Sequence, residues 1–428
     1  MIMITTRIFP IAAALALIVP AMSQPVLDPA GGQTVEDLVQ RALKQNGGLL
    51  AGQSQIAAAR GGVTQARLKA NPSIQLNDSQ EALGSQNNFM IGGTLPLELY
   101  HRRERRTEVA EASVKMSEFE QAERERQMRA EVESKFGDVL AAVRNLQVAN
   151  DLLTLNRRAL DLTQARADQG AIPPLDANML RVELNRIDSL RVDLESRLGI
   201  ALLELKTLSG MKPDEELRVK GSIDAALTIE DIALPQVVEI RPDLLAARAS
   251  EQVAAAKLRQ AETEARPDAS FSVNYQRADS SFNVNGLNVA GQLRPVQGVF
   301  HYLAAGVSIN LPTRNKNQGA IETAIAQNQE ARRKREYAEL IAAREIASAI
   351  LARDKTLESL RIFRDGVRGQ ARQNLDVVRR TYELGRTQLL DVISEQRRFI
   401  DIEMGYTEAL SRYYQALVRL RSVTGGRR

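Results

Sequence analysis

The chain has 428 residues, of which 26% are charged and only 4% aromatic, and it contains neither tryptophan nor cysteine. A composition rich in Ala, Leu, Arg, Glu and Gln is typical of long helices packed side by side rather than of a compact globule. The formal net charge is only +4, so the basic pI gives no reason to expect nucleic acid as a partner. Without cysteine there is no disulfide framework.

Residues 1–23 have the pattern of a secretory signal peptide. Arg7 supplies a positive start, "IFPIAAALALIVPAM" an apolar segment, and "AMS" a small-residue cleavage site before Gln24. The apolar run is about 15 residues, shorter than the ~20 that a membrane-spanning helix needs. We therefore expect the mature protein to leave the cytoplasm, without a lipid-anchored N-terminal cysteine.

Two blocks of the sequence repeat, which predicts an internally duplicated fold. Residues 165–210 match 380–425 without a gap, and "GGLLAGQ…ARLKANPS" (47–73) matches "PDLLAAR…AETEARPD" (242–268). Between these blocks the second half carries an insertion, "RADSSFNVNGLNVAGQLRPVQGVF" (277–300). Its Gly, Asn and Ser content predicts a loop.

The expected fold class is mainly α with a small β part, each half running helix, strand, strand, long helix, turn, helix. The first repeat spans 24–210, with a β-hairpin at 73–99 and a helical hairpin whose tip lies near residue 170. The second spans 236–425, with a β-hairpin at 270–311 and a tip near residue 385, and 211–235 is the linker. The expected helices are 34–70, 102–169, 173–208, 237–265, 318–383 and 387–423.

Apolar residues in the long helices have the near-heptad spacing of a coiled coil. In the first half they are Val132, Phe136, Val139, Val143, Leu146 and Leu153. A helix of about 68 residues is about 100 Å long, so helices 34–70 and 173–208, placed end to end, run alongside 102–169. An ordinary scaffolding coiled coil explains these helices but neither the strands nor the signal peptide. The strands leave two alternatives open, a membrane barrel closed from several copies and a small soluble sheet.

These features together resemble the TolC-type outer-membrane efflux proteins of Gram-negative bacteria, over nearly the whole mature chain. The resemblance rests on the two helix–strand–strand–helix repeats, on the proline of "NPS" and "RPD" before each hairpin, and on two "G-x5-D" turns. It also rests on "RTYELGRTQLLDVISEQRRFIDIEMGYTEALSRYYQALVRLRSVTG" (380–425). Within the family, "GVSINLPTRNKNQG" (306–319) is similar to the heavy-metal, CzcC-like branch.

The resemblance implies a homotrimer in the outer membrane, with one twelve-stranded barrel and a helical tunnel through the periplasm. It implies a periplasmic adaptor and an inner-membrane pump of RND type as partners, outer-membrane lipid around the barrel, and no cofactor. The implied function is a passive exit duct, here for heavy-metal cations. Alternatives are a drug-efflux or type I secretion duct of the same family and, from another class, a secreted coiled-coil structural protein without a channel.

Gly170 and Gly385 are expected to end the descending helices, because glycine adopts a positive φ without strain. Pro173 and Pro174 suit the first turn of the following helix. By residue pattern alone these are ordinary helical hairpin turns. The resemblance implies that Gly170 and Gly385 also mark the periplasmic tips on which the adaptor docks.

Asp176 and Asp391 lie in the first turn of the next helix, where the helix dipole favours a carboxylate by ~0.3–1 kcal/mol. The resemblance implies in addition that Asp391 faces the pore and that three copies form a cation-attracting ring. Ser394 stands where many relatives carry a second aspartate. The resemblance also implies that Asp176 and Tyr382 form a pair that holds the closed state.

Thr387 stands where the family's basic partner in this closure is expected, and Arg386 beside it is the candidate substitute.

The run "YHRRERR" (100–106) is either a solvated helix start or a contact with lipid head groups. The only two histidines, His101 and His301, lie at strand boundaries. We expect no enzyme and no metal site, since neither a Ser-His-Asp set nor a His-rich cluster is present, and both histidines are expected at the membrane interface.

Overall fold

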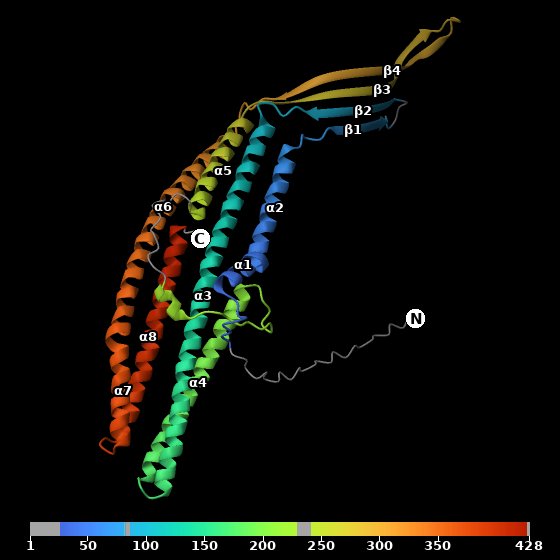
Figure 1. Cartoon of the computed structure of the whole chain (residues 1–428). Coiled ribbons are helices and arrows are strands. Elements are labelled where there is room, and N and C mark those ends of the chain that lie inside the picture. The colour runs from blue at the N-terminus through green and yellow to red at the C-terminus, as the bar shows by residue number, and fades with distance from the viewer. Residues whose placement is uncertain (1–25, 81, 83–85, 229–240, 426–428) are drawn as a thin grey trace, which may run out of the picture.

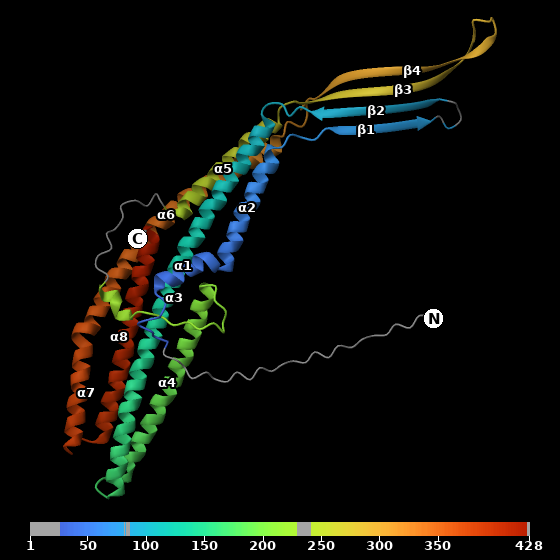
Figure 2. The same cartoon turned by 45° about the vertical axis from the view of Figure 1, so that its right-hand side comes forward.

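The computed structural model describes residues 26–80, 82, 86–228 and 241–425. The expected signal peptide and residues 229–235 of the expected linker lie outside them. The helices form a long rod, and the strands project as a sheet from one end of it (Figures 1 and 2).

In chain order the elements are α1 (Val35–Gln45), α2 (Gly47–Arg67), β1 (Ser73–Gln80), β2 (Asn87–Pro96), α3 (Arg102–Asp168), α4 (Pro174–Leu208), the 3₁₀-helix η1 (Ile223–Thr228), α5 (Pro242–Glu264), β3 (Asp268–Leu287), β4 (Leu293–Asn310), α6 (Gln318–Arg361), the π-helix η3 (Ile362–Val367), α7 (Arg368–Glu383) and α8 (Leu389–Thr424).

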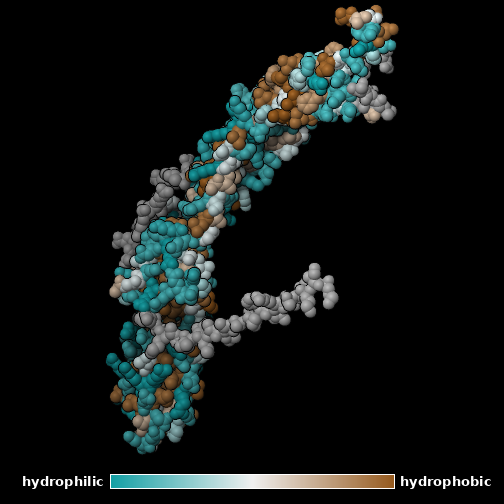
Figure 3. All heavy atoms as spheres, turned by 90° about the vertical axis from the view of Figure 1, so that its right-hand side faces the viewer, coloured by the Kyte–Doolittle hydropathy of each residue, from teal (hydrophilic) through white to brown (hydrophobic). Residues whose placement is uncertain are grey.

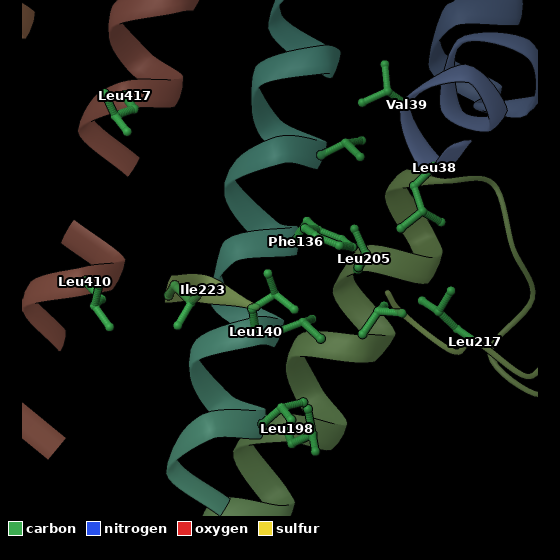
Figure 4. Close-up of a cluster of buried hydrophobic side chains, with 14 of the residues drawn as sticks. Leu38, Val39, Phe136, Leu140, Leu198, Leu205, Leu217, Ile223, Leu410 and Leu417 are labelled. Carbon is green, nitrogen blue, oxygen red and sulfur yellow. The ribbon is translucent and has the colours of Figure 1, made fainter. Parts of the chain in front are cut away.

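The main apolar core lies midway along the rod, where α3 packs against α1, α4, α8 and η1. Figure 4 shows Phe136 and Leu140 of α3 beside Leu198 and Leu205 of α4. The heptad positions expected in α3 are buried, apart from Leu146, which is partly buried. The 3.5-residue spacing therefore predicted the packing face of α3 correctly.

The expected single helix 34–70 is divided at Asn46, which ends α1 and begins α2. The Asn46 side-chain oxygen accepts the N–H of Gly48 at 2.9 Å, and its Nδ2 donates to Leu208 O, at the end of α4, at 3.0 Å. Asparagine favours such a cap over a helix interior because its side chain competes for backbone hydrogen bonds. The cap also fixes the junction at which α4 and α2 follow one another along α3, as expected.

The expected helix 318–383 is likewise interrupted, by the π-helical turn η3. In a π-helix, residues five apart lie on one face, so Phe363 and Arg368 both face α8. Phe363 packs so closely on Gly405 that a Cβ there would lie 3.0 Å from the ring. Arg368 lies over the ring of Tyr406, 4.8 Å from its centroid, and donates to Glu403 Oε1 at 2.6 Å. Packing against α8 thus favours the π turn over a continuous α-helix.

The four strands form one antiparallel sheet in the order β1-β2-β3-β4. The loop expected at 277–300 is wrong: β3 continues to Leu287 and β4 begins at Leu293. The turn is held by the Asn288 side-chain oxygen, which accepts the N–H groups of Ala290 and Gln292 at 3.0 and 2.9 Å. Cross-strand pairing here overrides the weak strand propensity of Gly, Asn and Ser.

The expected linker contributes Leu217, Val219 and Ile223 to the core, where all three are buried. Val219 forms isolated bridges with Leu27 and Gln33. This segment therefore ties the N-terminal residues to the middle of the rod. No helix in the described part of the chain is long and apolar enough to cross a membrane.

Part of the basic run 100–106 is used within the chain, at the junction of rod and sheet. Arg102 Nη2 donates to Arg266 O, just after α5, at 2.7 Å. Arg106 donates from Nε to Ala66 O and from Nη2 to Leu68 O, at the end of α2, at 3.1 and 3.0 Å. These arginines satisfy helix-end carbonyls that otherwise lack partners. His101 adopts a left-handed conformation before α3, and its side chain is exposed.

The close approach of α3 and α8 gives a first testable prediction. A Cβ added at Gly137 would lie 2.4 Å from the Tyr414 ring, so Gly137→Ala is expected to destabilise the protein by ~1–3 kcal/mol through overpacking. At Gly62, in α2, a Cβ meets nothing within 4 Å. Gly62→Ala is expected to be neutral or to stabilise by up to ~1 kcal/mol. Thermal unfolding followed by circular dichroism in detergent compares the two, and equal melting temperatures contradict the close contact.

Candidate functional site: the helical tips and the two-faced sheet

The two helical tips have the same backbone geometry. Gly170 and Gly385 have φ of +73° and +71°, values that residues with a Cβ rarely adopt. Each tip forms the two hydrogen bonds of a Schellman motif. The bonds are Gly170 N to Ala167 O (2.9 Å), Ala171 N to Arg166 O (2.9 Å), Gly385 N to Tyr382 O (2.8 Å) and Arg386 N to Thr381 O (3.0 Å). The repeat in sequence is therefore a repeat in hydrogen bonding.

The helices that leave the tips begin differently. In α4, Pro173 is the N-cap and Pro174 the first helical residue. In α8, Gln388 and Asp391 form a reciprocal cap, in which the Gln388 N–H donates to Asp391 Oδ2 at 3.2 Å. Asp391 is exposed. Its carboxylate thus stabilises the helix start while keeping its charge in contact with solvent.

The two tips pack on one another through a small apolar cluster. Leu180 of α4 and Leu389, Val392 and Ile393 of α8 are buried in it, and Tyr382 lies partly buried against them. This cluster joins the first hairpin to the second near their ends. Separating the tips therefore exposes these apolar side chains to water, which opposes opening.

Tyr382 and Asp176 are close in space, although no hydrogen bond between them is found in the described residues. Burial raises the pKa of Tyr382, and the negative charge of Asp176 raises it further, whereas a hydrogen bond with Thr163 and the charge of Arg166 lower it. The tyrosine of the second tip thus faces residues of the first tip. Its partners come from both α3 and α4.

Among the described residues, the remaining expected ones make no hydrogen bond or ion pair across the tips. Ser394 donates its hydroxyl to Leu390 O in its own helix at 2.8 Å. The Thr387 hydroxyl is buried without a hydrogen-bond partner in the structure described here. Arg386 is exposed. Within one chain, these three residues do not join the hairpins.

An ion pair that sequence reasoning missed does join them. Glu183 of α4 is 1% exposed, and its Oε2 accepts from Nε and Nη2 of Arg397 of α8 at 3.1 and 2.8 Å. Its Oε1 accepts from Arg186 at 2.7 and 2.9 Å. A buried carboxylate needs such partners, because desolvation otherwise makes its charge costly.

A signal for this ion pair was present in the heptad pattern. Glu183 occupies the seam position between Leu180 and Ile187, both of which are buried apolar residues. A carboxylate in an apolar seam indicates a cationic partner on the facing helix. Which arginine supplies it depends on how α4 and α8 are aligned, and the sequence alone does not contain that alignment.

The sheet has two different faces. Residues paired across the strands point to the same side, and one side is apolar and exposed, appearing as the continuous hydrophobic area over the sheet in Figure 3. That side carries Ile74, Leu76, Phe89, Ile91, Leu95, Phe271, Val273, Tyr275, Leu303, Val307 and Ile309. The other side is largely polar and includes Ser73, Gln75, Asn77, Ser79, Asn88, Thr94, Ser270, Ser272, Asn274, Gln276 and Ser308.

The ion pair gives a second prediction. Arg397→Gln leaves Glu183 paired with Arg186 alone and is expected to weaken the contact of the two tips by ~1–2 kcal/mol, because Arg397 is half exposed. Backbone amides of 389–400 are then expected to exchange with deuterium about tenfold faster. Arg191→Gln is the matched control, since the ion pairs that Arg191 forms in the described residues, with Asp188 and Glu195, both lie within α4. Equal exchange in both variants contradicts a cross-hairpin role.

Comparison with known proteins identifies the family of the chain. Residues 38–211 and 233–426 match the outer membrane efflux protein family. The chain is 24% identical over 401 residues to the "Cobalt-zinc-cadmium resistance protein CzcC" of Cupriavidus metallidurans, covering 93% of this chain and 91% of that protein.

Two solved structures show the same fold. The outer-membrane channel OprN has a TM-score of 0.73 at 18% identity, with 99% of each chain covered. The transmembrane channel CusC has a TM-score of 0.75 at 17% identity, with 92% of each chain covered. The expected TolC-type resemblance is confirmed: this chain belongs to the outer membrane efflux protein family and lies in the outer membrane.

Proposed function

We propose that three copies of this chain close their sheets into one twelve-stranded barrel and their helices into a periplasmic tunnel. The two-faced sheet carries this proposal. β1 and β4 are its edge strands in the described residues, so each has one side without a strand partner. In lipid such edges are unsatisfied unless the sheet closes, and the exposed apolar side then faces lipid while the polar side lines the channel.

The helical tips are proposed to dock on a periplasmic adaptor, which connects the channel to an inner-membrane pump of RND type. Exposed leucines surround both tips: Leu175, Leu384 and Leu390 are 63%, 71% and 54% exposed. Apolar side chains exposed beside two identical turns fit a partner surface rather than water. Gly170 and Gly385 set the shape of that surface through their positive φ.

The pore entrance is proposed to carry a ring of three Asp391 carboxylates. Asp391 is exposed and fixed by its cap to Gln388, so its position near the tip is defined. Asp176 and Tyr382 lie together behind it and, with the Glu183–Arg397 ion pair, hold the closed arrangement. Opening then requires the two hairpins of each chain to separate.

The proposed substrates are heavy-metal cations. The support is the similarity to CzcC, a cobalt-zinc-cadmium resistance protein, together with the carboxylate at the proposed entrance. A carboxylate ring favours cations over anions without binding them in a closed site. The channel is passive in this proposal, and the pump supplies the energy. A drug-efflux or type I secretion duct is the second candidate within the family.

Conductance of the purified protein tests the channel and its entrance. In planar bilayers we expect heat-resistant trimers with a cation-selective current. Asp391→Asn is expected to lower the selectivity for cations while preserving the cap, because the amide oxygen still accepts the Gln388 N–H. Asp214→Asn, an exposed position outside the tips, is the control. A monomeric, non-conducting protein rejects the proposal, and unchanged selectivity in Asp391→Asn rejects the ring.

Growth of a deletion strain tests the cargo. Loss of the gene is expected to reduce survival in cobalt, zinc or cadmium salts by at least about tenfold while leaving drug sensitivity unchanged, because an exit duct limits export of its pump's substrate. Complementation with the wild-type gene is expected to restore growth. Sensitivity to drugs but not to metals selects the second candidate, and a secretion defect alone selects a type I duct.

A further inference from the structure

The apolar side of the sheet ends along one straight row of paired residues. The row Leu76, Ile91, Tyr275 and Leu303 is apolar across all four strands, whereas the next row outward is Asp78, Phe89, Arg277 and His301. Charged or polar side chains therefore appear on three of the four strands at the same level. A boundary of this kind is expected where a lipid-facing surface leaves the hydrocarbon region.

The apolar side also has a direction along the strands. Along β3 it runs from Ala269 to Tyr275, about 20 Å at ~3.3 Å per residue. The helices are attached at the Ala269 end (Figure 1). Arg277 and His301 therefore lie at the outer, extracellular boundary of the membrane.

Arg277 and His301 are direct cross-strand partners, so their side chains emerge side by side. The Tyr275 hydroxyl and His301 Nδ1 are 2.7 Å apart, and the two rings stack with centroids 6.0 Å apart. When the hydroxyl donates to Nδ1, the ring hydrogen of His301 is on Nε2. Tyr275 thereby holds the imidazole, and its Nε2–H remains as the second ring donor on the strand next to Arg277.

The carboxylates at this level leave part of the Arg277 guanidinium accessible. Asp279 forms an ion pair with Arg277, its Oδ2 lying 3.8 Å from Nη2, too far for a hydrogen bond. Asp78 lies two strands away from Arg277, at ~4.8 Å per strand. The Arg277 guanidinium is 44% exposed. The exposed part of the guanidinium is therefore open to an anion from the membrane side, in competition with the Asp279 carboxylate.

We propose that Arg277 and His301, positioned by Tyr275, bind a phosphate group of the glycolipid that forms the outer leaflet. This inference rests on the proposed barrel, which places the apolar side in lipid. A guanidinium presents a fork of donors that fits phosphate oxygens, and the imidazole N–H adds a third contact. The apolar row below, with Tyr275 and Leu303, contacts the acyl chains of the same lipid.

Binding of purified full-length protein to lipid A tests the site. The probes are bisphosphorylated lipid A, the same lipid A after enzymatic removal of its phosphates, and inorganic phosphate. We expect the bisphosphorylated form to bind at least about fivefold more tightly than the dephosphorylated form. One basic residue near a membrane surface increases the affinity for an anionic lipid by about this factor. The double change Arg277→Gln with His301→Gln is expected to abolish that preference.

Two further variants separate recognition from general effects. Arg294→Gln is the matched control, because Arg294 lies on the same hairpin but on the opposite side of the strand and is exposed. Its lipid preference is expected to stay unchanged. Tyr275→Phe keeps the ring but removes the hydroxyl that holds His301, so it is expected to lower the preference as much as His301→Gln does.

The outcomes that overturn the proposal are distinct from failure of the barrel. Equal affinity of the wild type for both lipid A forms, or a double variant that keeps the preference, rejects the phosphate site. If inorganic phosphate binds as tightly as lipid A, the site recognises free phosphate, and the lipid is rejected as its ligand. Conductance is measured in parallel: a conducting trimer without phosphate preference rejects only this inference, whereas absent trimers and absent conductance reject the proposed barrel.

Discussion

The structure depends on α3, a single helix of 67 residues against which most other elements pack. It contacts α2 and α5 near the sheet, α1 and η1 in the middle, and α4 and α8 toward the tips. Its buried residues change side along its length, because its neighbours change. Arg102 and Arg106 at its start hold the ends of α5 and α2, so the helix that forms the core also fixes how the sheet joins the rod.

The two halves share their turns but differ in their long helices. The tips at Gly170 and Gly385 have the same hydrogen bonds because these depend on a few neighbouring residues. The long helix of the first half is continuous, whereas that of the second is interrupted by η3. The difference arises from contacts distant in sequence: Arg144 of α3 and Arg368 of α7 both lie over the Tyr406 ring, at 5.1 and 4.8 Å. The two repeats therefore share the hydrogen bonds of their tips, whereas packing against distant residues makes their long helices different.

The sequence was sufficient for features that local patterns determine. The heptad seam of α3, the helical tips and the alternating strands follow from the spacing of apolar residues and from Gly and Pro. It was insufficient where partners distant in the chain decide. Asn46 becomes a helix end because Leu208 O is within reach. Glu183 becomes a link between hairpins because Arg397 faces it. Likewise, 277–287 and 293–300 form strands because each strand supplies the other's hydrogen bonds.

The low aromatic content, which first indicated long helices, also explains how apolar residues are divided between rod and sheet. The rod packs with many small side chains, including Ala342 and Ala349, both 0% exposed, because alanine allows helices to approach closely. Large apolar groups on the sheet are instead exposed: Ile74 and Leu303 are 75% and 79% exposed. In water such a surface is unfavourable. A chain with small residues buried in its rod and large apolar residues exposed on its sheet is adapted to water around the rod and to lipid around the sheet. The level at which lipid gives way to water again accounts for the single row of the sheet where charged side chains reappear.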